Sequence, residues 1–189
     1  SLLEAQGVSL KDARDLTKMT ALRGADFELL AKARQALAAV KLPLALELIE
    51  QLEEQEEPAL VFCSHRGPID AIGKRPGWAA ITGDTPDHVR KALNEKFQAG
   101  ELQGLALTIQ AGGTALTLTR AAQVVFIDRM WTPALNEQAE DRALRLGQTR
   151  GVVITILEVD HAIDYRVNEL LRQKQELIED TLGGYNDEP

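Results

Sequence analysis

Two arginines near the end of an expected helix could bind an anion. Gln138, Asp141, Arg142 and Arg145 are spaced at offsets of 0, 3, 4 and 7 residues, a spacing that places side chains on one face of a helix. Guanidinium groups form paired hydrogen bonds with phosphoryl oxygens and suit the charge that spreads over a phosphoryl group in transfer. The arrangement favours a shared phosphate ligand. An ordinary surface ion pair between Asp141 and Arg145 is the alternative.

Two turns that follow apolar runs could also hold an anion. Gly112 and Gly113 come shortly after a run that ends at Ile109, and adjacent glycines let backbone amides approach a phosphate closely. Gly83 and Thr85 follow another apolar run in the same way. A plain turn at the first position and a capped turn at the second are the simpler interpretations.

The sequence lacks a nucleotide-binding loop of the common type. Gly73-Lys74 has neither the upstream glycine nor the following Ser or Thr that a phosphate-binding loop requires, and no acidic pair follows an expected strand. Cys63 and three scattered histidines cannot build a four-ligand zinc site, so no metal site is expected. The arginines would therefore contact a phosphate that is bound mainly by residues outside this chain.

Alternating strands and helices must position these residues. Helices are expected over 86–99 and 133–146, and each begins with a threonine cap followed by proline. The alternation predicts an α/β fold, a parallel sheet covered by helices on both faces, with ligands at the carboxyl ends of its strands. The apolar runs that predict buried strands are 59–63, 78–81, 105–109, 124–127 and 152–157.

The chain has about the length of one large domain. We expect a connector or partial helix over 1–25 and the α/β lobe over 26–158, which begins with two helices separated by Pro43. Over 159–189 we expect a C-terminal helix, from about residue 162 to 182, packed on the lobe and followed by an acidic tail.

Charge is unevenly distributed along the chain. The net charge is −8, yet residues 60–158 carry 11 Lys and Arg against 10 Asp and Glu, so the acidity lies in the flanks. Six glutamates between residues 47 and 57 are expected to form a solvated helix face. Net charge therefore does not exclude a phosphate-binding surface in the middle of the chain.

The composition also suggests a compartment. The chain has no apolar stretch of the length that a membrane helix needs and does not start like a signal peptide. A single cysteine suits a reducing environment. We expect an intracellular protein, cytoplasmic or nuclear, with no membrane partner.

The ordered segments between about residues 26 and 176 resemble the second RecA-like lobe of the Swi/Snf-type DNA-dependent ATPases of superfamily two. The most specific match is 138–148, which is similar to the family's sixth motif, Gln-Ala-x-Asp-Arg-x-His-Arg-x-Gly-Gln, with Leu144 in place of His. The other matches, in order along the chain, are 61–65 to the fourth motif, 83–85 with Arg90 and Phe97 to a Gly-Ser-Thr segment, 108–118 to the fifth motif, and 128–133 to Asp-Pro-x-Trp-Asn-Pro.

The resemblance implies a RecA-like fold and individual residue roles. Arg142 and Arg145 would be arginine fingers that reach ATP with Mg²⁺, both held mainly by an absent first lobe. Gln138 and Asp141 would arrange these fingers, and Gly112 and Gly113 would also lie near the nucleotide. The residues implied to face the backbone of duplex DNA are Ser64, His65, Gly83, Thr85, Gln110, Gly112, Gly113 and Trp131, although Trp131 as a core residue is the alternative, and Gln110 replaces the usual Lys.

The sequence thus predicts the second motor lobe of an ATP-dependent double-stranded DNA translocase or remodeller. Its partners would be the first RecA-like lobe of the same protein and the duplex DNA backbone, and the isolated chain would not hydrolyse ATP. Two alternatives stay open: an RNA-directed or RNA-polymerase-recycling ATPase lobe, and a hydrolysis-dead lobe that acts as a protein-interaction scaffold. A dinucleotide-binding domain fits poorly because the Gly-x-Gly-x-x-Gly pattern is missing.

Overall fold

The computed structural model describes residues 24–111, 116–130, 132–144, 148–161, 164–165, 168–169 and 172. Ala38–Met130 and Ala134–Glu158 form one compact unit, which contains the whole sheet; we call it the sheet unit. A second unit includes the described residues 24–37 and those from Val159 onward. No helix in the described part of the chain has the length and apolar character that a bilayer span needs.

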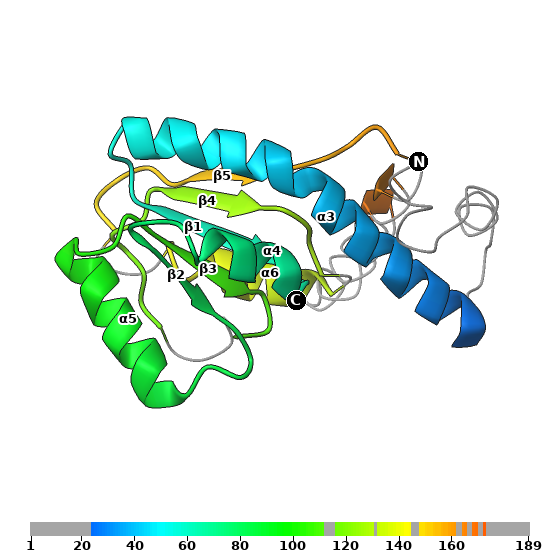
Figure 1. Cartoon of the computed structure of the whole chain (residues 1–189), viewed down its shortest axis with the longest axis horizontal. Coiled ribbons are helices and arrows are strands. Elements are labelled where there is room, and N and C mark those ends of the chain that lie inside the picture. Colours follow the sequence, from blue (N-terminus) through cyan, green and yellow to red (C-terminus); the bar gives the residue numbers. More distant parts are fainter. Residues whose placement is uncertain are drawn as a thin grey trace, which may run out of the picture. The chain divides into compact units, whose positions relative to one another are not determined.

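A five-stranded parallel sheet forms the centre of the sheet unit (Figure 1). Its order is β2-β3-β1-β4-β5, and every pair of neighbours is parallel. All five expected strands are confirmed to within one or two residues at each end. Their bounds are β1 Ala59–Cys63, β2 Trp78–Ile81, β3 Gly104–Thr108, β4 Gln123–Phe126 and β5 Val153–Ile156.

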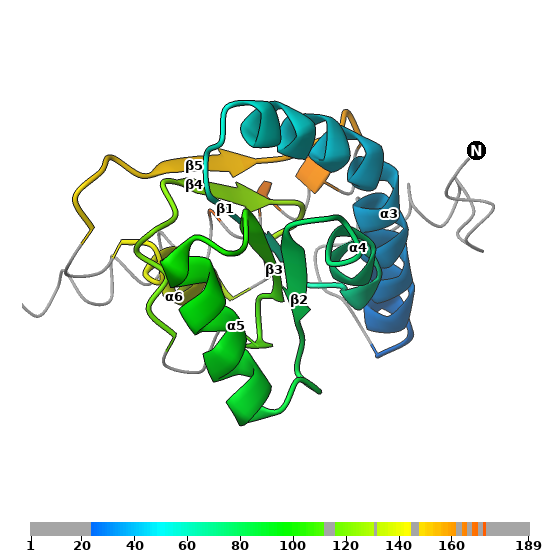
Figure 2. The same cartoon turned by 60° about the vertical axis from the view of Figure 1, so that its left-hand side comes forward.

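Hydrophobic clusters cover both faces of the sheet. β1 is buried along its whole length, and its side chains alternate between the two clusters, as expected for a central parallel strand. Phe62 stacks on Phe126 in one cluster, with ring centroids 5.3 Å apart. Helices α5 and α6 contribute to this cluster, whereas α3 and α4 contribute to the other, so helices cover both faces (Figure 2). The bounds of the helices are α3 Gly24–Glu54, α4 Arg66–Ile72, α5 Asp87–Ala99 and α6 Pro133–Glu140.

Helix α3 continues through Pro43, so the prediction of two helices separated at this proline is wrong. An interior proline loses one backbone hydrogen bond and costs roughly 3 kcal/mol. Pro43 is exposed, while Ala38 before it and Ala45 and Ile49 after it recur at helical spacing and are buried against the sheet. Burial of this continuous apolar stripe offsets the cost of the proline.

The prediction that Thr85 caps α5 is also wrong. Pro86 is the N-cap of α5, with no side-chain hydrogen bond to the helix. The Thr85 hydroxyl instead accepts a hydrogen bond of 2.9 Å from the backbone amide of Thr82. The hydroxyl therefore stabilises the turn between β2 and α5 rather than the first turn of the helix.

Only part of the expected C-terminal helix can be compared. Residues 164–165, 168–169 and 172 are helical. The rest of that helix, residues 1–23 and the acidic tail lie outside the described residues.

Glu53 of α3 holds the loop before β2 in place. Its carboxylate accepts hydrogen bonds from Arg75 Nη2 at 2.7 Å and from Trp78 Nε1 at 2.7 Å. The hydrogen bond from Arg75 lowers the pKa of Glu53, against an opposing effect of burial. These contacts fix the Trp78 ring, which lies directly over Gly104 of β3.

Gly104→Ala should destabilise the protein. A Cβ at this position would lie 2.3 Å from two ring carbons of Trp78, which Glu53 prevents from moving away. We expect the free energy of unfolding in urea to fall by about 1–3 kcal/mol, as for other overpacked cores. Gly67→Ala is the matched control, because its Cβ would meet no atom within 4 Å. Equal stability of Gly104→Ala and the wild type would contradict this packing.

Candidate functional site

Four loops meet at the carboxyl ends of β1, β2, β3 and β4. Because the strands are parallel and adjacent, these ends share one edge of the sheet, which we call the carboxyl edge. The structure therefore brings together the loops of most residues that the sequence assigned to DNA: Ser64, His65, Gly83, Thr85 and Gln110. Gly112, Gly113 and Trp131 lie outside the described residues.

Asp128 joins the loops that follow β1 and β4. It is only 8% exposed. One carboxylate oxygen accepts a hydrogen bond of 2.6 Å from the Ser64 amide, and the other accepts from the Ser64 hydroxyl. His65 Nε2 lies 3.5 Å from the second oxygen. Both donors of Ser64 are thus bound inside the chain, so a phosphate contact through them would compete with Asp128.

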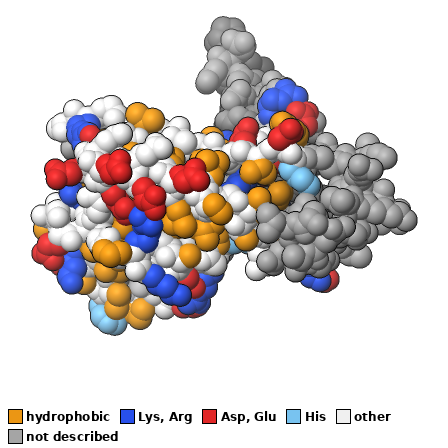
Figure 3. Space-filling model, turned by 45° about the horizontal axis from the view of Figure 1, so that its top comes forward, with side chains coloured by type: hydrophobic (Ala, Val, Ile, Leu, Met, Phe, Trp, Pro, Cys, Tyr) orange, Lys and Arg blue, Asp and Glu red, His pale blue; other side chains and the backbone are white. Residues whose placement is uncertain are grey.

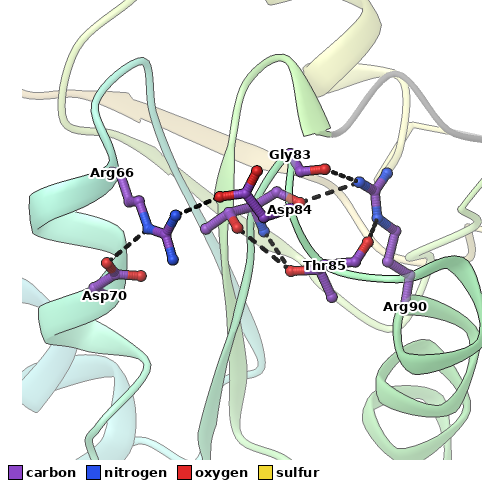
Figure 4. Close-up of polar contacts among 7 residues, drawn as sticks. Arg66, Asp70, Gly83, Asp84, Thr85 and Arg90 are labelled. Carbon is purple, nitrogen blue, oxygen red and sulfur yellow. Dashed lines mark hydrogen bonds and ion pairs between the residues drawn. The ribbon is translucent and has the colours of Figure 1, made fainter.

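Arg90 of α5 joins the loops that follow β2 and β3, and Figure 4 shows its contacts with the first of these loops. Its guanidinium donates to the backbone oxygens of Thr85 at 2.7 Å, Gly83 at 3.0 Å and Thr82 at 3.1 Å. A fourth, longer hydrogen bond of 3.5 Å reaches the oxygen of Ala111. Arg90 is 8% exposed, and these carbonyls satisfy the buried charge with neutral acceptors.

The position of Arg90 could have been recognised from the sequence. It is seven residues before Phe97, which is fully buried in the core, so both residues lie on the same face of α5. An arginine on the buried face of a helix needs several internal acceptors, and loop carbonyls nearby are the natural ones. From the sequence, Arg90 was expected only as part of a motif.

An exposed ion pair connects α4 with the turn after β2 (Figure 4). Arg66 donates to Asp70 at 3.0 Å and to Asp84 at 2.5 Å. The hydrogen bond with Asp70, and then the charge of the same residue, raise the pKa of Arg66. Beside this pair Gly83 is exposed, and a Cβ there would meet no atom within 4 Å. The backbone of this turn is therefore open to a ligand.

Residues 138–148, which contain Arg142 and Arg145 and which we call the arginine segment, depart from the expected helix over 133–146. Helix α6 ends at Glu140, and the bonds after it are mixed: the Arg142 and Ala143 amides donate three residues back, to Ala139 and Glu140, whereas the Asp141 and Leu144 amides keep the helical spacing of four residues. The Arg142 oxygen accepts a 3.0 Å hydrogen bond from the Leu118 amide. This contact with a distant segment takes the carbonyl that a longer helix would use.

The described side chains of the arginine segment differ in burial. Gln138 and Asp141 are exposed, whereas Arg142 is only 6% exposed. Arg145 lies outside the described residues. Burial raises the pKa of Glu140, partly opposed by the charge of Arg129. The prediction that Gln138, Asp141 and Arg142 share one helix face stays a prediction, although Arg142 is far more buried than the other two residues.

Asn136 is a positioning residue that the sequence analysis missed. Its side-chain oxygen accepts a 2.8 Å hydrogen bond from the Met130 amide, and its side-chain nitrogen donates to the Met130 oxygen at 2.9 Å. This pair fixes the chain between β4 and α6 at its start. No group of three or more His, Cys, Asp or Glu that could hold a metal ion occurs among the described residues.

Comparison with known proteins identifies the family. The helicase conserved C-terminal domain matches residues 40–147. A Xenopus laevis relative, SWI/SNF-related matrix-associated actin-dependent regulator of chromatin subfamily A-like protein 1, is 34% identical over 75% of this chain and 15% of its own length. The ATP-dependent helicase ULS1 of Saccharomyces cerevisiae is 34% identical over 48% of this chain and 6% of its own length. The chain thus spans a small part of these relatives.

A solved structure supports the same assignment at the level of fold. The C-terminal part of the Fun30 ATPase domain superimposes with a TM-score of 0.64 and 22% sequence identity. The match covers 90% of this chain and 64% of that structure. The chain therefore belongs to the helicase conserved C-terminal domain family and is a RecA-like C-terminal lobe of the Swi/Snf type.

Proposed function

We propose that this chain is the second motor lobe of an ATP-dependent translocase or remodeller that moves along double-stranded DNA. The observation that carries the proposal is the carboxyl edge, where buried Arg90 and Asp128 join four loops in pairs and leave the Gly83 turn open. Relatives whose names include ATP-dependent helicase and regulator of chromatin support it. No observation within the described ranges favours the RNA-directed or scaffold alternatives.

The DNA contacts would come from the carboxyl edge. Gly83 and Gln110 are exposed, whereas Ser64, His65 and Thr85 are half-buried. Backbone amides and neutral side chains at such an edge suit phosphate oxygens, which carry no base information. We assign the first contacts to Gly83 and Gln110, with Ser64, His65, Thr85, Gly112, Gly113 and Trp131 completing the surface.

The arginine segment would act on ATP that the first lobe of the same protein holds together with Mg²⁺. The reaction would be the transfer of a phosphoryl group from ATP to water. This chain would supply the guanidinium groups of Arg142 and Arg145. Guanidinium donors fit a phosphoryl group by charge and by geometry. The fixed backbone of Arg142 supports this role, because a preorganised charge stabilises a transition state best. Gln138 and Asp141 would arrange the arginines from exposed positions, and Gly112 and Gly113 would lie beside the nucleotide.

In the protein that carries both lobes, Arg142→Ala or Arg145→Ala should lower kcat by on the order of 10³-fold, with a smaller change in ATP affinity. A lysine at either position should restore little activity, because an ammonium lacks the planar fork. The measurement is steady-state ATP hydrolysis at saturating DNA. Arg150→Ala, which removes an exposed ion pair with Glu57, is the control. Wild-type turnover in both alanine variants would show that these arginines are not fingers.

Gly83→Glu should weaken DNA binding without unfolding the protein. The position has open space around it, so the new side chain fits, and its negative charge would repel a phosphate at the carboxyl edge. We expect binding to labelled duplexes at low salt to weaken by at least roughly tenfold, since like charges that meet at an interface repel each other.

The matched control is Gly151→Glu, which adds the same charge in equally open space just before β5, at the opposite edge of the sheet. Duplexes of unrelated sequence should behave alike. If both glutamate variants bind DNA equally well, the Gly83 turn does not face the DNA.

A further inference from the structure

We propose that Gln148 is a positioning residue whose side-chain amide holds the arginine segment in register with the chain between β3 and β4. The proposal deepens the function proposed above and rests on it. It concerns a residue that touches neither the nucleotide nor DNA but ties together the two segments assigned to them.

Both the nitrogen and the oxygen of the Gln148 side-chain amide form hydrogen bonds. Its nitrogen donates to the backbone oxygen of Ala121 at 2.8 Å and to that of Ala143 at 3.2 Å. Its oxygen accepts a 3.0 Å hydrogen bond from the Arg150 amide. A primary amide has two hydrogens on its nitrogen, and both are engaged here with backbone carbonyls. Such a residue acts as a clamp, because no smaller side chain can reach the same three partners.

The bond to Ala143 holds the backbone directly beside Arg142. Ala143 follows Arg142 in the sequence, and its backbone oxygen accepts the second hydrogen bond of the Gln148 amide. Fixing this backbone in advance lowers the conformational entropy that an arginine finger loses when it engages ATP. The clamp thus preorganises the proposed finger Arg142.

The hydrogen bond to Ala121 ties Gln148 to the hydrophobic core. Ala121 and Leu118 are fully buried and form a turn, in which the Ala121 amide donates to the Leu118 oxygen at 3.1 Å. The Leu118 amide donates in turn to the Arg142 oxygen. Arg142 and Gln148 are therefore bound to the same turn, which follows the segment proposed to contact DNA. A shift of that segment on DNA binding would be transmitted to Arg142 and Gln148.

Gln148→Met and Gln148→Glu test the clamp in the protein with both lobes. Both variants keep the size of the side chain and lose its two donors, and Glu keeps an acceptor for the Arg150 amide. We expect kcat to fall on the order of 10- to 100-fold while KM for ATP changes less than about threefold, since small displacements of catalytic groups affect mainly the chemical step. Arg150→Ala is again the control, because it leaves the three hydrogen bonds of Gln148 intact.

Amide exchange in the chain 1–189 without nucleotide gives a second readout. Gln148→Met should speed exchange of the Leu118 amide by on the order of tenfold, because its acceptor Arg142 is no longer held. Arg150→Ala should leave that amide unchanged. Unchanged exchange at Leu118 in Gln148→Met would overturn the proposal, as would a loss of kcat in Gln148→Glu alone, which would report only its added charge.

Arg142→Ala and Arg145→Ala, assayed in the same series, separate the two proposals. If these variants lose turnover and Gln148→Met does not, the clamp is refuted and the proposed function stands. If the arginine variants turn over at the wild-type rate, the proposed function fails and the clamp has no fingers to position. Turnover is measured well below the melting temperature of each variant, so that loss of folded protein cannot imitate loss of positioning.

Discussion

The polar groups that follow parallel strands at the carboxyl edge must find hydrogen-bond partners outside the sheet. Parallel pairing brings the ends of β1, β2, β3 and β4 to one edge, and the loops that follow leave the sheet there. Two buried side chains of opposite charge meet this requirement. Arg90 supplies donors to loop carbonyls, and Asp128 supplies acceptors to a loop amide and a hydroxyl. Internal hydrogen bonds of Arg90 and Asp128 therefore hold in place the surface on which the proposed function depends.

This arrangement explains how a lobe of net negative charge can present a surface to phosphates. The charged groups at the edge are largely used for internal contacts, while the open positions, such as Gly83, offer the backbone. Much of the acidity lies elsewhere: exposed glutamates gather over the C-terminal part of α3, at the left of the face shown in Figure 3. Net charge is thus a poor guide to what one edge of a sheet can bind.

The acidic run between residues 47 and 57 is more than the solvated face that its composition indicates. Glu53 holds Arg75 and Trp78, and Glu57 pairs with Arg150 at 2.6 Å. Glu47, Glu50 and Glu54 are exposed, as expected, although Glu50 also approaches Arg75 at 3.5 Å. Arginines that lie 20 or more residues away in the sequence supply the partners, so a search of the helix alone for Lys and Arg could not find them.

The sequence by itself determined the elements and their order, because short apolar runs and helical periodicity are local properties. It placed all five strands, their parallel arrangement and the helices on both faces, and the spacing of its motifs indicated the family. Tertiary structure alone decided that α3 continues through Pro43, where α6 ends, how deeply Arg142 is buried and which partners Asp128, Arg90 and Gln148 bind. These outcomes depend on contacts between distant residues, such as Ser64 with Asp128, 64 positions apart, and Ala121 with Gln148, 27 positions apart. No local pattern encodes such contacts, because they form only when the sheet brings the loops together.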